Sequence, residues 1–272
     1  MKLLIAINSL EQYRKILCFS AQFVESAGES PTILHIVKNE SEQQNRSLGG
    51  FSEIAQEILK VPNITSIVRT GNAADEIIKE TEKGQFDLLI TAEIPINFSR
   101  IFLGTGTPHI INKVPCPVMI AKGPCRPIRR ILLCDSGAGR SSTLSKFTAL
   151  LVDTLGGHED VTVIHVMSQI SAGPGVAGKQ LRAGFDELLE AHTPEGELLD
   201  RDIQLLDQPG IHPKPLVVHG LVVDEILSEA RKGDYDLIVI GAHVEKNLRR
   251  FLLENLARRI LKQSDRPVLV VK

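Results

Sequence analysis

The sequence has little that marks a metal centre: its four cysteines form no C-x-x-C pair, and its eight histidines show no H-x-x-x-H or Cys/His spacing. We therefore predict no metal site. Cys18 and Cys134 lie in apolar segments, where a small buried thiol is the usual interpretation, and a reducing cytoplasm is then the simplest compartment. His35 and His165 occupy matching positions in two similar segments, TILHIV and TVIHVM, which favours a structural role.

Long apolar runs and an excess of charge of one sign are also missing. The opening stretch, MKLLIAINSLEQYRK, has only a short apolar run, so we expect a first strand there rather than a signal peptide or membrane span. With 31 Lys and Arg against 33 Asp and Glu, the formal net charge is −2, which argues against a nucleic-acid or membrane-surface partner. The basic stretch Leu248–Lys262 could bind an anion, although a solvated face is the commoner interpretation.

Patterns that mark common enzymes are absent too. The G-x-S-x-G elbow is missing, and no Ser-His-Asp or Cys-His spacing stands out, so we predict that the chain is not an enzyme. The Gly- and Ser-rich segment 136–142 loosely resembles the pyrophosphate loop of ATP-pyrophosphatase adenylating enzymes but lacks its Asp. A turn between a strand and a helix is the simpler interpretation of this segment.

What the sequence does contain is a long internal repeat. Residues 71–90 (GNAADEIIKETEKGQFDLLI) and 220–239 (GLVVDEILSEARKGDYDLIV) match at one constant offset, and CPVMIAK at 116–122 returns as RPVLVVK at 266–272. Such self-similarity indicates two copies of one domain. We place the domains at residues 1–124 and 125–272, joined by the stiff, proline-containing segment Lys122–Pro127.

One connection differs in length between the copies. Met167 to Gly220 spans 53 residue steps, whereas Val37 to Gly71 spans 34, so the second copy has nineteen more. The longer connection, at about 168–215, contains several prolines and glycines, which predict a surface excursion rather than added core. These residues are Pro194, Gly196, Pro209, Gly210, Pro213 and Pro215.

Each copy alternates short aliphatic runs with helical patterns, which predicts an α/β fold with a doubly wound, Rossmann-like, parallel five-stranded sheet in each half. Leu248, Phe251, Leu252, Leu256 and Ile260 recur at helical spacing before the last strand. The expected strands are Leu3–Ile7, Thr32–Val37, Ile64–Val68, Leu88–Thr91 and Val118–Ala121, then Ile131–Cys134, Val161–Met167, Leu216–Val218, Leu237–Ile240 and Val268–Val271.

In both halves this pattern resembles the universal stress protein family. The resemblance rests on I-L-L-C-D-S-G at 131–137, T-V-I-H-V at 162–166, D-L-I-V-I-G at 236–241 and P-V-L-V-V at 267–271, and on their counterparts in the first half. It implies a strand order of 3-2-1-4-5 and an internal pseudo-dimer paired through Val118–Ala121 and Val268–Val271. One subgroup of the family binds ATP at the carboxyl ends of the strands, with an Asp after strand one facing the nucleoside and G-(x)2-G-(x)9-G-[ST] holding the phosphates.

The second copy departs from this phosphate motif. Counted from Gly241, the remaining positions fall on Val244, Glu254 and Asn255, so only the first glycine is present. We interpret Glu254 as a carboxylate near a helix N-terminus, where it would repel phosphate, with Asn255 as an N-cap. Asp135 keeps the nucleoside-facing carboxylate.

The first copy departs differently. It keeps Gly104-Thr105, but the two earlier glycine positions fall on Thr91 and Ile94 when counted back from Gly104, or on Ala92 and Pro95 when counted from the strand. Asn8 follows the first strand where the family has Asp. Thr107-Pro108 is interpreted as an N-cap followed by the first residue of a helix. The candidate nucleotide-site residues of both halves are Asn8, Ile36, Gly104, Thr105, Asp135, Ser136, Gly137, Val166, Gly241, Ala242 and Arg249.

The resemblance implies a cytoplasmic, non-catalytic stress-response regulator that acts by binding a ligand or a protein partner. The alternative is an ATP-binding switch or slow ATPase that uses a residual nucleotide site in one half. Because the features of the family's site are divided between the halves, we expect tight ATP binding in neither.

Overall fold

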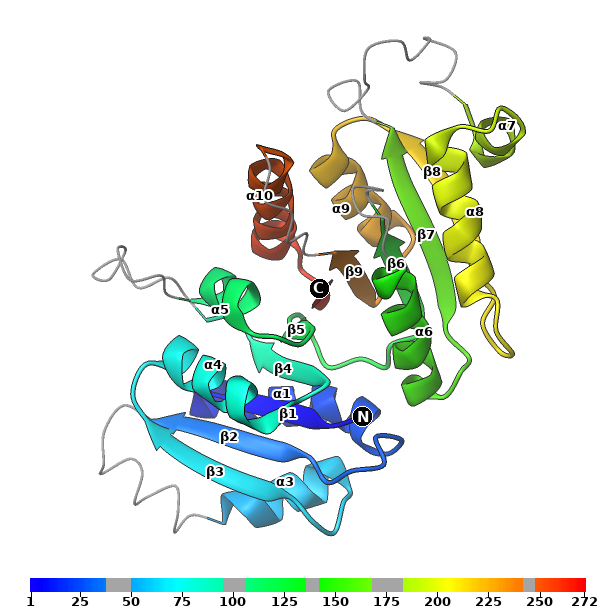
Figure 1. Ribbon diagram of the computed structural model, residues 1–272. Coiled ribbons are helices and arrows are strands. Elements are labelled where there is room, and N and C mark those ends of the chain that lie inside the picture. Colours follow the sequence, from blue (N-terminus) through cyan, green and yellow to red (C-terminus); the bar gives the residue numbers. More distant parts are fainter. Residues whose placement is uncertain (38–49, 95–105, 136–141, 168–182, 242–247) are drawn as a thin grey trace. The chain divides into compact units, whose positions relative to one another are not determined.

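A computed structural model describes residues 1–37, 50–94, 106–135, 142–167, 183–241 and 248–272 (Figure 1). The chain divides into two compact units, Met1–Pro127 and Ile128–Lys272. The pairing of the two halves through Val118–Ala121 and Val268–Val271 stays a prediction.

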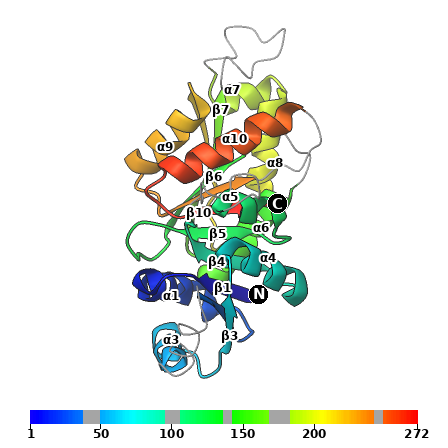
Figure 2. The same ribbon diagram turned by 90° about the vertical axis from the view of Figure 1, so that its left-hand side faces the viewer.

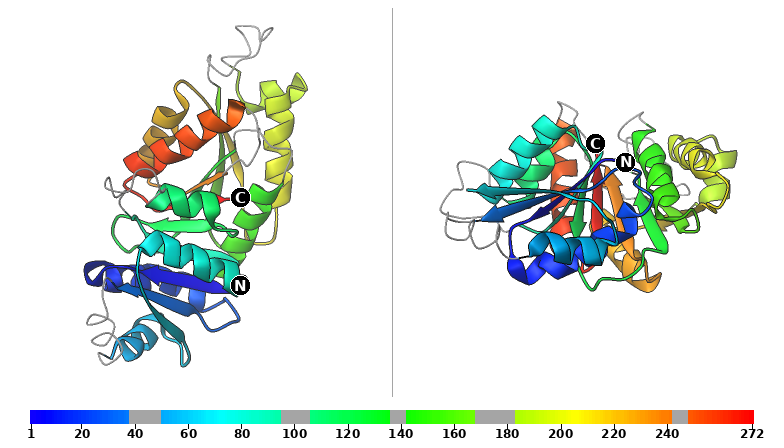
Figure 3. Two further views of the ribbon diagram at one scale, coloured as in Figure 1. Left: turned by 60° about the vertical axis from the view of Figure 1, so that its left-hand side comes forward. Right: turned by 90° about the horizontal axis from the view of Figure 1, so that it is seen from below.

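The first unit is a parallel sheet in the order β3-β2-β1-β4-β5. Helices α1 and α3 cover one face of this sheet and α4 and α5 the other (Figure 3). Its elements are β1 Leu3–Ile7, α1 Leu10–Val24, β2 Thr32–Val37, α3 Phe51–Leu59, β3 Thr65–Thr70, α4 Ala73–Gly84, β4 Leu88–Ala92, α5 Thr107–Lys113 and β5 Val118–Ala121.

The second unit repeats the plan in the order β8-β7-β6-β9-β10, so the predicted fold class is confirmed. Helices α9 and α10 lie side by side on one face (Figure 2), and α6 and α8 cover the other. Its elements are β6 Arg130–Cys134, α6 Thr143–Leu155, β7 Asp160–Met167, α7 Phe185–Glu190, α8 Pro194–Leu206, β8 Lys214–His219, α9 Val222–Lys232, β9 Leu237–Gly241, α10 Leu248–Gln263 and β10 Val268–Val271.

The central strands follow the predicted apolar runs closely, because they are buried on both faces. The edge strands deviate most: β3 runs two residues past its predicted end, and β8 begins two residues early. Both are partly exposed, so their polar ends are not marked by apolar residues. β8 also contains Pro215, which an edge strand tolerates.

The repeated Lys-Gly-x-aromatic-Asp segment has the same structural role in both units. A Cβ on Gly233 would lie 2.2 Å from the Tyr235 ring, so only glycine allows this close packing. The Tyr235 ring in turn lies under the Arg130 guanidinium, 5.1 Å away. Asp236 accepts hydrogen bonds from the backbone N–H groups of Arg129 and Arg130 at 2.9 and 3.0 Å, which fixes the start of β6. In the first unit these roles fall to Gly84, Phe86, Lys2 and Asp87.

Replacing Gly233 with alanine is expected to lower the free energy of unfolding by about 1–2 kcal/mol, because the new methyl group would displace the Tyr235 ring. Urea denaturation measures the effect. Gly184→Ala is the matched control, since an added Cβ there meets no atom within 4 Å. Equal costs for the two variants would contradict the packing role of Gly233.

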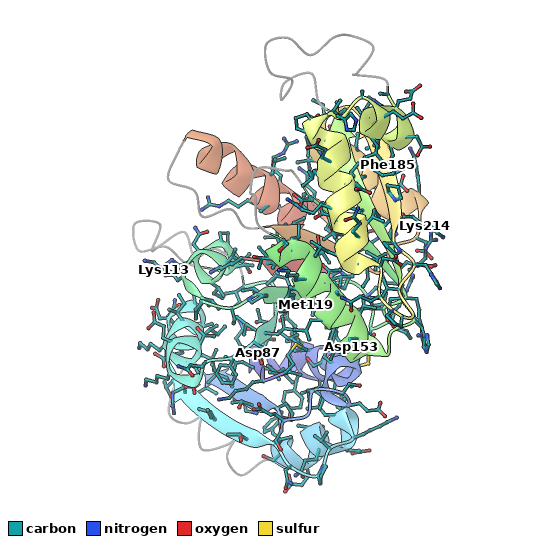
Figure 4. All side chains as sticks on the ribbon, turned by 45° about the vertical axis from the view of Figure 1, so that its right-hand side comes forward. Asp87, Lys113, Met119, Asp153, Phe185 and Lys214 are labelled. Atoms are coloured by element: carbon teal, nitrogen blue, oxygen red, sulfur yellow. A yellow bond between two sulfur atoms is a disulfide. The ribbon has the colours of Figure 1, made fainter. Side chains whose placement is uncertain are left out.

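The described part of the longer connection, from residue 183 onward, is not the surface excursion that its prolines and glycines predict. It forms α7 and α8, whose Leu188, Leu198 and Leu199 are buried. Pro194 stands in the first turn of α8, where its missing N–H costs nothing, and the Thr193 hydroxyl accepts a bond from the Gly196 N–H at 3.1 Å. Figure 4 labels Phe185 and Lys214, the first residues of α7 and β8.

Two predicted helix starts are also wrong. The N-cap of α5 is Gly106 rather than Thr107, because the Thr107 hydroxyl instead accepts a hydrogen bond from the Ile94 N–H at 2.8 Å. Helix α10 begins at Leu248, so Glu254 and Asn255 stand inside it rather than at its N-terminus. The interpretation that Glu254 repels phosphate at a helix N-terminus is therefore not supported by its position in the helix.

The prediction that Cys18 is a buried thiol is wrong as well. Cys18 lies on the exposed side of α1 and forms a disulfide with Cys125, 107 residues further along the chain. Its neighbours Leu17 and Phe19 face the core, and they give the segment its apolar character. Cys134 is buried and free, as predicted, and burial raises the pKa of its thiol.

Candidate functional site

The carboxyl ends of β6 and β9 form the candidate site of the second unit. The order of connection reverses between these two strands, and in open α/β sheets ligands bind at such a reversal. Asp135 directly follows β6, Gly241 ends β9, and the preceding residues Cys134 and Ile240 pair across the two strands. Val166 lies near the end of the neighbouring strand β7. The structure therefore brings Asp135, Gly241 and Val166 to one edge of the sheet.

The other candidate residues are distributed as follows. Asn8 and Ile36 lie at the corresponding edge of the first unit, next to the paired residues Ile7 and His35. Arg249 is in the first turn of α10, but its side chain is outside the described part of the chain. Gly104, Thr105, Ser136, Gly137 and Ala242 lie outside the described residues.

The strand registers correct the counterpart of Asp135 in the first unit, which is Ile7 rather than Asn8. Residues of β1 and β6 correspond when their partners on the neighbouring strands are equivalent in the repeat, which makes Leu4 the counterpart of Leu132. Three residues further along the chain, Ile7 is then the counterpart of Asp135, and Asn8 that of Ser136. The matching pairs are Leu4–Thr32 and Leu132–Thr162, and Leu3–Leu88 and Ile131–Leu237.

Asp135 is engaged by a helix of the longer connection. Its side chain is 7% exposed, and its Oδ2 lies 3.6 Å from Nη2 of Arg201 on α8. The same guanidinium lies 3.0 Å from the carboxylate of Asp202, which is fully buried. With Ser145 of α6 and His165 of β7, these residues form what we call the Asp135 cluster: Asp135, Ser145, His165, Arg201 and Asp202. Helix α8 lies along α6 and β7 and thus carries two charges to the carboxyl edge of the sheet (Figures 1 and 4).

Burial and the nearby Asp135 carboxyl raise the pKa of Asp202 from 3.8 to about 6. Ser145 and Arg201 act in the opposite direction, because both favour the charged carboxylate. His165 Nδ1 lies 3.4 Å from the Asp135 carbonyl oxygen, and burial lowers the pKa of its imidazole despite this contact and the charge of Glu195. Near neutral pH the cluster therefore combines a neutral His165, one guanidinium and two neighbouring carboxyl groups.

The first unit fills the equivalent space with apolar side chains. Ile7 is fully buried, and His35, the counterpart of His165, stacks on Tyr13 with ring centroids 5.7 Å apart. Phe51 of α3 packs against both rings. The two histidines thus share a strand position, as their repeat predicts, but one packs among aromatic rings and the other contacts the charged cluster.

Sequence reasoning missed Ser145, Arg201 and Asp202. No motif marks them, and Arg201 and Asp202 lie in a connection that its composition assigns to the surface. An Arg-Asp pair inside an otherwise amphipathic helix is the only available signal, and it is weak because most such pairs are solvated.

Within the part of the chain that the structure describes, no three His, Cys, Asp or Glu side chains come together as a metal site would require. The described helices are also all too short or too polar to span a membrane.

Comparison with known proteins identifies the family. The model of the Universal stress protein family matches residues 1–122 and 128–272. Universal stress protein MJ0577 of Methanocaldococcus jannaschii is 31% identical over 125 residues, covering 42% of this chain and 77% of that protein, and MJ0531 of the same organism is 29% identical over 110 residues, covering 40% and 64%. The crystal structure of a universal stress protein from Archaeoglobus fulgidus shares the fold across 99% of this chain and 96% of its own, with a TM-score of 0.65 and 17% identity. The chain belongs to the universal stress protein family, with one family domain in each half.

Proposed function

We propose that the protein is a non-catalytic regulator that acts by binding a ligand or a protein partner, and that its second half is closed against adenine nucleotides by α8. The observation that carries this proposal is the ion pair between Arg201 and the buried Asp135 carboxylate. In ATP-binding relatives this carboxylate would face the nucleoside. In this protein, the Arg201 guanidinium pairs with the Asp135 carboxylate instead.

The energetics support closure. A ribose hydroxyl that binds Asp135 has to displace a charge-assisted contact, and it then leaves Arg201 and Asp202 to rearrange within a largely buried cluster. The first half offers no carboxylate at this position, because Ile7 stands there. A nucleotide therefore gains little binding free energy from Asp135 or from Ile7 in the wild-type protein.

We test the proposal by titrating ATP, with and without magnesium, into the wild type and into the double variant Arg201→Gln, Asp202→Asn. The wild type is expected to show no saturable heat of binding. The double variant frees Asp135 and leaves one buried carboxylate without its cation rather than two, so it is expected to bind at least about tenfold more tightly. The matched control is Arg259→Gln, Asp224→Asn, which removes an exposed ion pair and should behave as the wild type does.

The second candidate function is an ATP-binding switch or slow ATPase. It is favoured by the position of Asp135 and Gly241 at the reversal of strand order. Under this alternative, adenine nucleotide is recovered from the purified protein at about one per chain, and Asp135→Asn weakens binding by about tenfold or more. Under the regulator proposal, Asp135→Asn leaves nucleotide binding undetectable.

A further inference from the structure

The Cys18–Cys125 disulfide joins two parts of the chain with different roles. Cys18 is on α1, which buries Tyr13, Ile16 and Phe23 against the sheet and is thus firmly part of the first unit. Cys125 lies in the segment Lys122–Pro127, which we call the connector because it leads from β5 of the first unit to the second unit. The bond therefore fastens the connector to the first unit.

Both cysteines of the disulfide are exposed, whereas the other two, Cys116 and Cys134, are buried and form no disulfide. An exposed disulfide can be reached by a thiolate from solution, and such bonds are the labile or regulatory ones. In reducing compartments, surface disulfides are commonly transient or redox-sensing. The distribution of the four cysteines thus separates one reactive pair from two inert thiols.

We propose that the Cys18–Cys125 bond is a redox-sensitive crosslink that limits how far the connector can extend. With the bond closed, five residue steps separate Cys125 from Arg130, the first residue of β6. With the bond open, nine steps separate Ala121, the last residue of β5, from Arg130. At about 3.5 Å per extended residue, the maximum reach grows from roughly 17 Å to roughly 31 Å.

Two further contacts of the connector are non-covalent. Gln22 on α1 donates a hydrogen bond to the Arg126 carbonyl oxygen at 3.1 Å, and Lys122 pairs with the exposed Glu93 at 2.9 Å. The hydrogen bond is exposed and the ion pair has one exposed partner, so each contributes only about 1 kcal/mol to stability. Opening the disulfide should therefore release the middle of the connector while the folded unit stays intact.

The exchange step balances with a dithiol reductant. Its thiolate attacks one sulfur of the Cys18–Cys125 bond and forms a mixed disulfide, and its second thiol then displaces the protein sulfur. Two electrons and two protons pass from the dithiol to the protein, which leaves two cysteine thiols and the reductant as a disulfide. Closure is the reverse reaction with a small-molecule disulfide as oxidant.

Limited trypsin digestion of the full chain tests the proposal, with cleavage after Lys122 as the readout. The digest is quenched and reduced before mass analysis, because the disulfide would otherwise hold the fragments 1–122 and 123–272 together. Pretreatment of folded wild type with dithiothreitol is expected to raise the cleavage rate several-fold. Cys18→Ser should be cleaved at the fast rate with or without reductant, and Cys116→Ala, the matched control, should keep the wild-type response.

Alkylation of the folded protein provides the second measurement. Two thiols are expected to become reactive only after reduction, with circular dichroism unchanged. The proposal is overturned if the bond survives dithiothreitol in the folded protein, since it would then be a structural crosslink. It is equally overturned if two thiols react without reductant, or if reduction leaves the cleavage rate after Lys122 unchanged.

Discussion

Replacing Arg201 with alanine is expected to destabilise the protein near neutral pH more than any other single change considered for the Asp135 cluster. The change leaves the carboxyl groups of Asp135 and Asp202, whose side chains are 7% and 0% exposed, without their cation. Removing one partner of a buried ion pair costs about 3–5 kcal/mol. Because the Arg201 side chain is 34% exposed, solvent screening should reduce the loss in the free energy of unfolding to about 2–3 kcal/mol.

Urea denaturation of Arg201→Ala measures this loss. The matched control is Arg259→Ala, whose partner Asp224 is 55% exposed and whose removal should cost less than about 0.5 kcal/mol. Adding Asp202→Asn to Arg201→Ala should restore most of the stability, because one of the two buried charges is then gone. If Arg201→Ala costs no more than Arg259→Ala, the guanidinium does not hold the cluster together.

The second large effect concerns pH. The pKa of Asp202 is raised to about 6 in the folded protein, above its ordinary value of 3.8, so between these values the folded state binds more protons than the unfolded state. The stability from protonated Asp202 is therefore fully present below about pH 4 and is lost as the pH rises through about 6. The wild type should lose of the order of 2–3 kcal/mol of unfolding free energy from this group over that range.

Asp202→Asn should abolish this decline, because an amide does not titrate and still forms hydrogen bonds. The variant should thus gain stability relative to the wild type as the pH increases from about 4 to 7. The measurement is a series of urea denaturations across that range, with Asp207→Asn, an exposed position at the end of the same helix, as control. Parallel pH profiles for the wild type and Asp202→Asn would contradict the raised pKa.

The sheets could be predicted from the sequence because their central strands are buried on both faces. Runs such as Leu88–Ala92 and Leu237–Gly241 contain little besides aliphatic residues, so their pattern leaves few alternatives. The strand order 3-2-1-4-5 was implied by the resemblance to the universal stress protein family, and the repeat applies it to both halves. The bounds of the edge strands are predicted less accurately, because the exposed residues of these strands do not form an apolar run.

The candidate site could be predicted only in part. Asp135, Val166 and Gly241 follow from the strands, and the structure brings them together. The contacts of Arg201 and Asp202 depend on how α8 packs, which composition does not reveal. That Ile7 is the counterpart of Asp135 could be recognised only from the register of β1 and β6 with their neighbouring strands, because β1 and β6 end at different positions relative to their partners. The Cys18–Cys125 pair could not be predicted because its cysteines are 107 residues apart.

The most direct test of whether α8 closes the second half is a side-by-side calorimetric titration of ATP into the wild type and the double variant Arg201→Gln, Asp202→Asn. Closure by Arg201 predicts no saturable binding by the wild type and measurable binding by the double variant, whose Asp135 carboxylate is released. Binding of about one ATP per wild-type chain that is unchanged in the double variant and lost in Asp135→Asn would contradict closure.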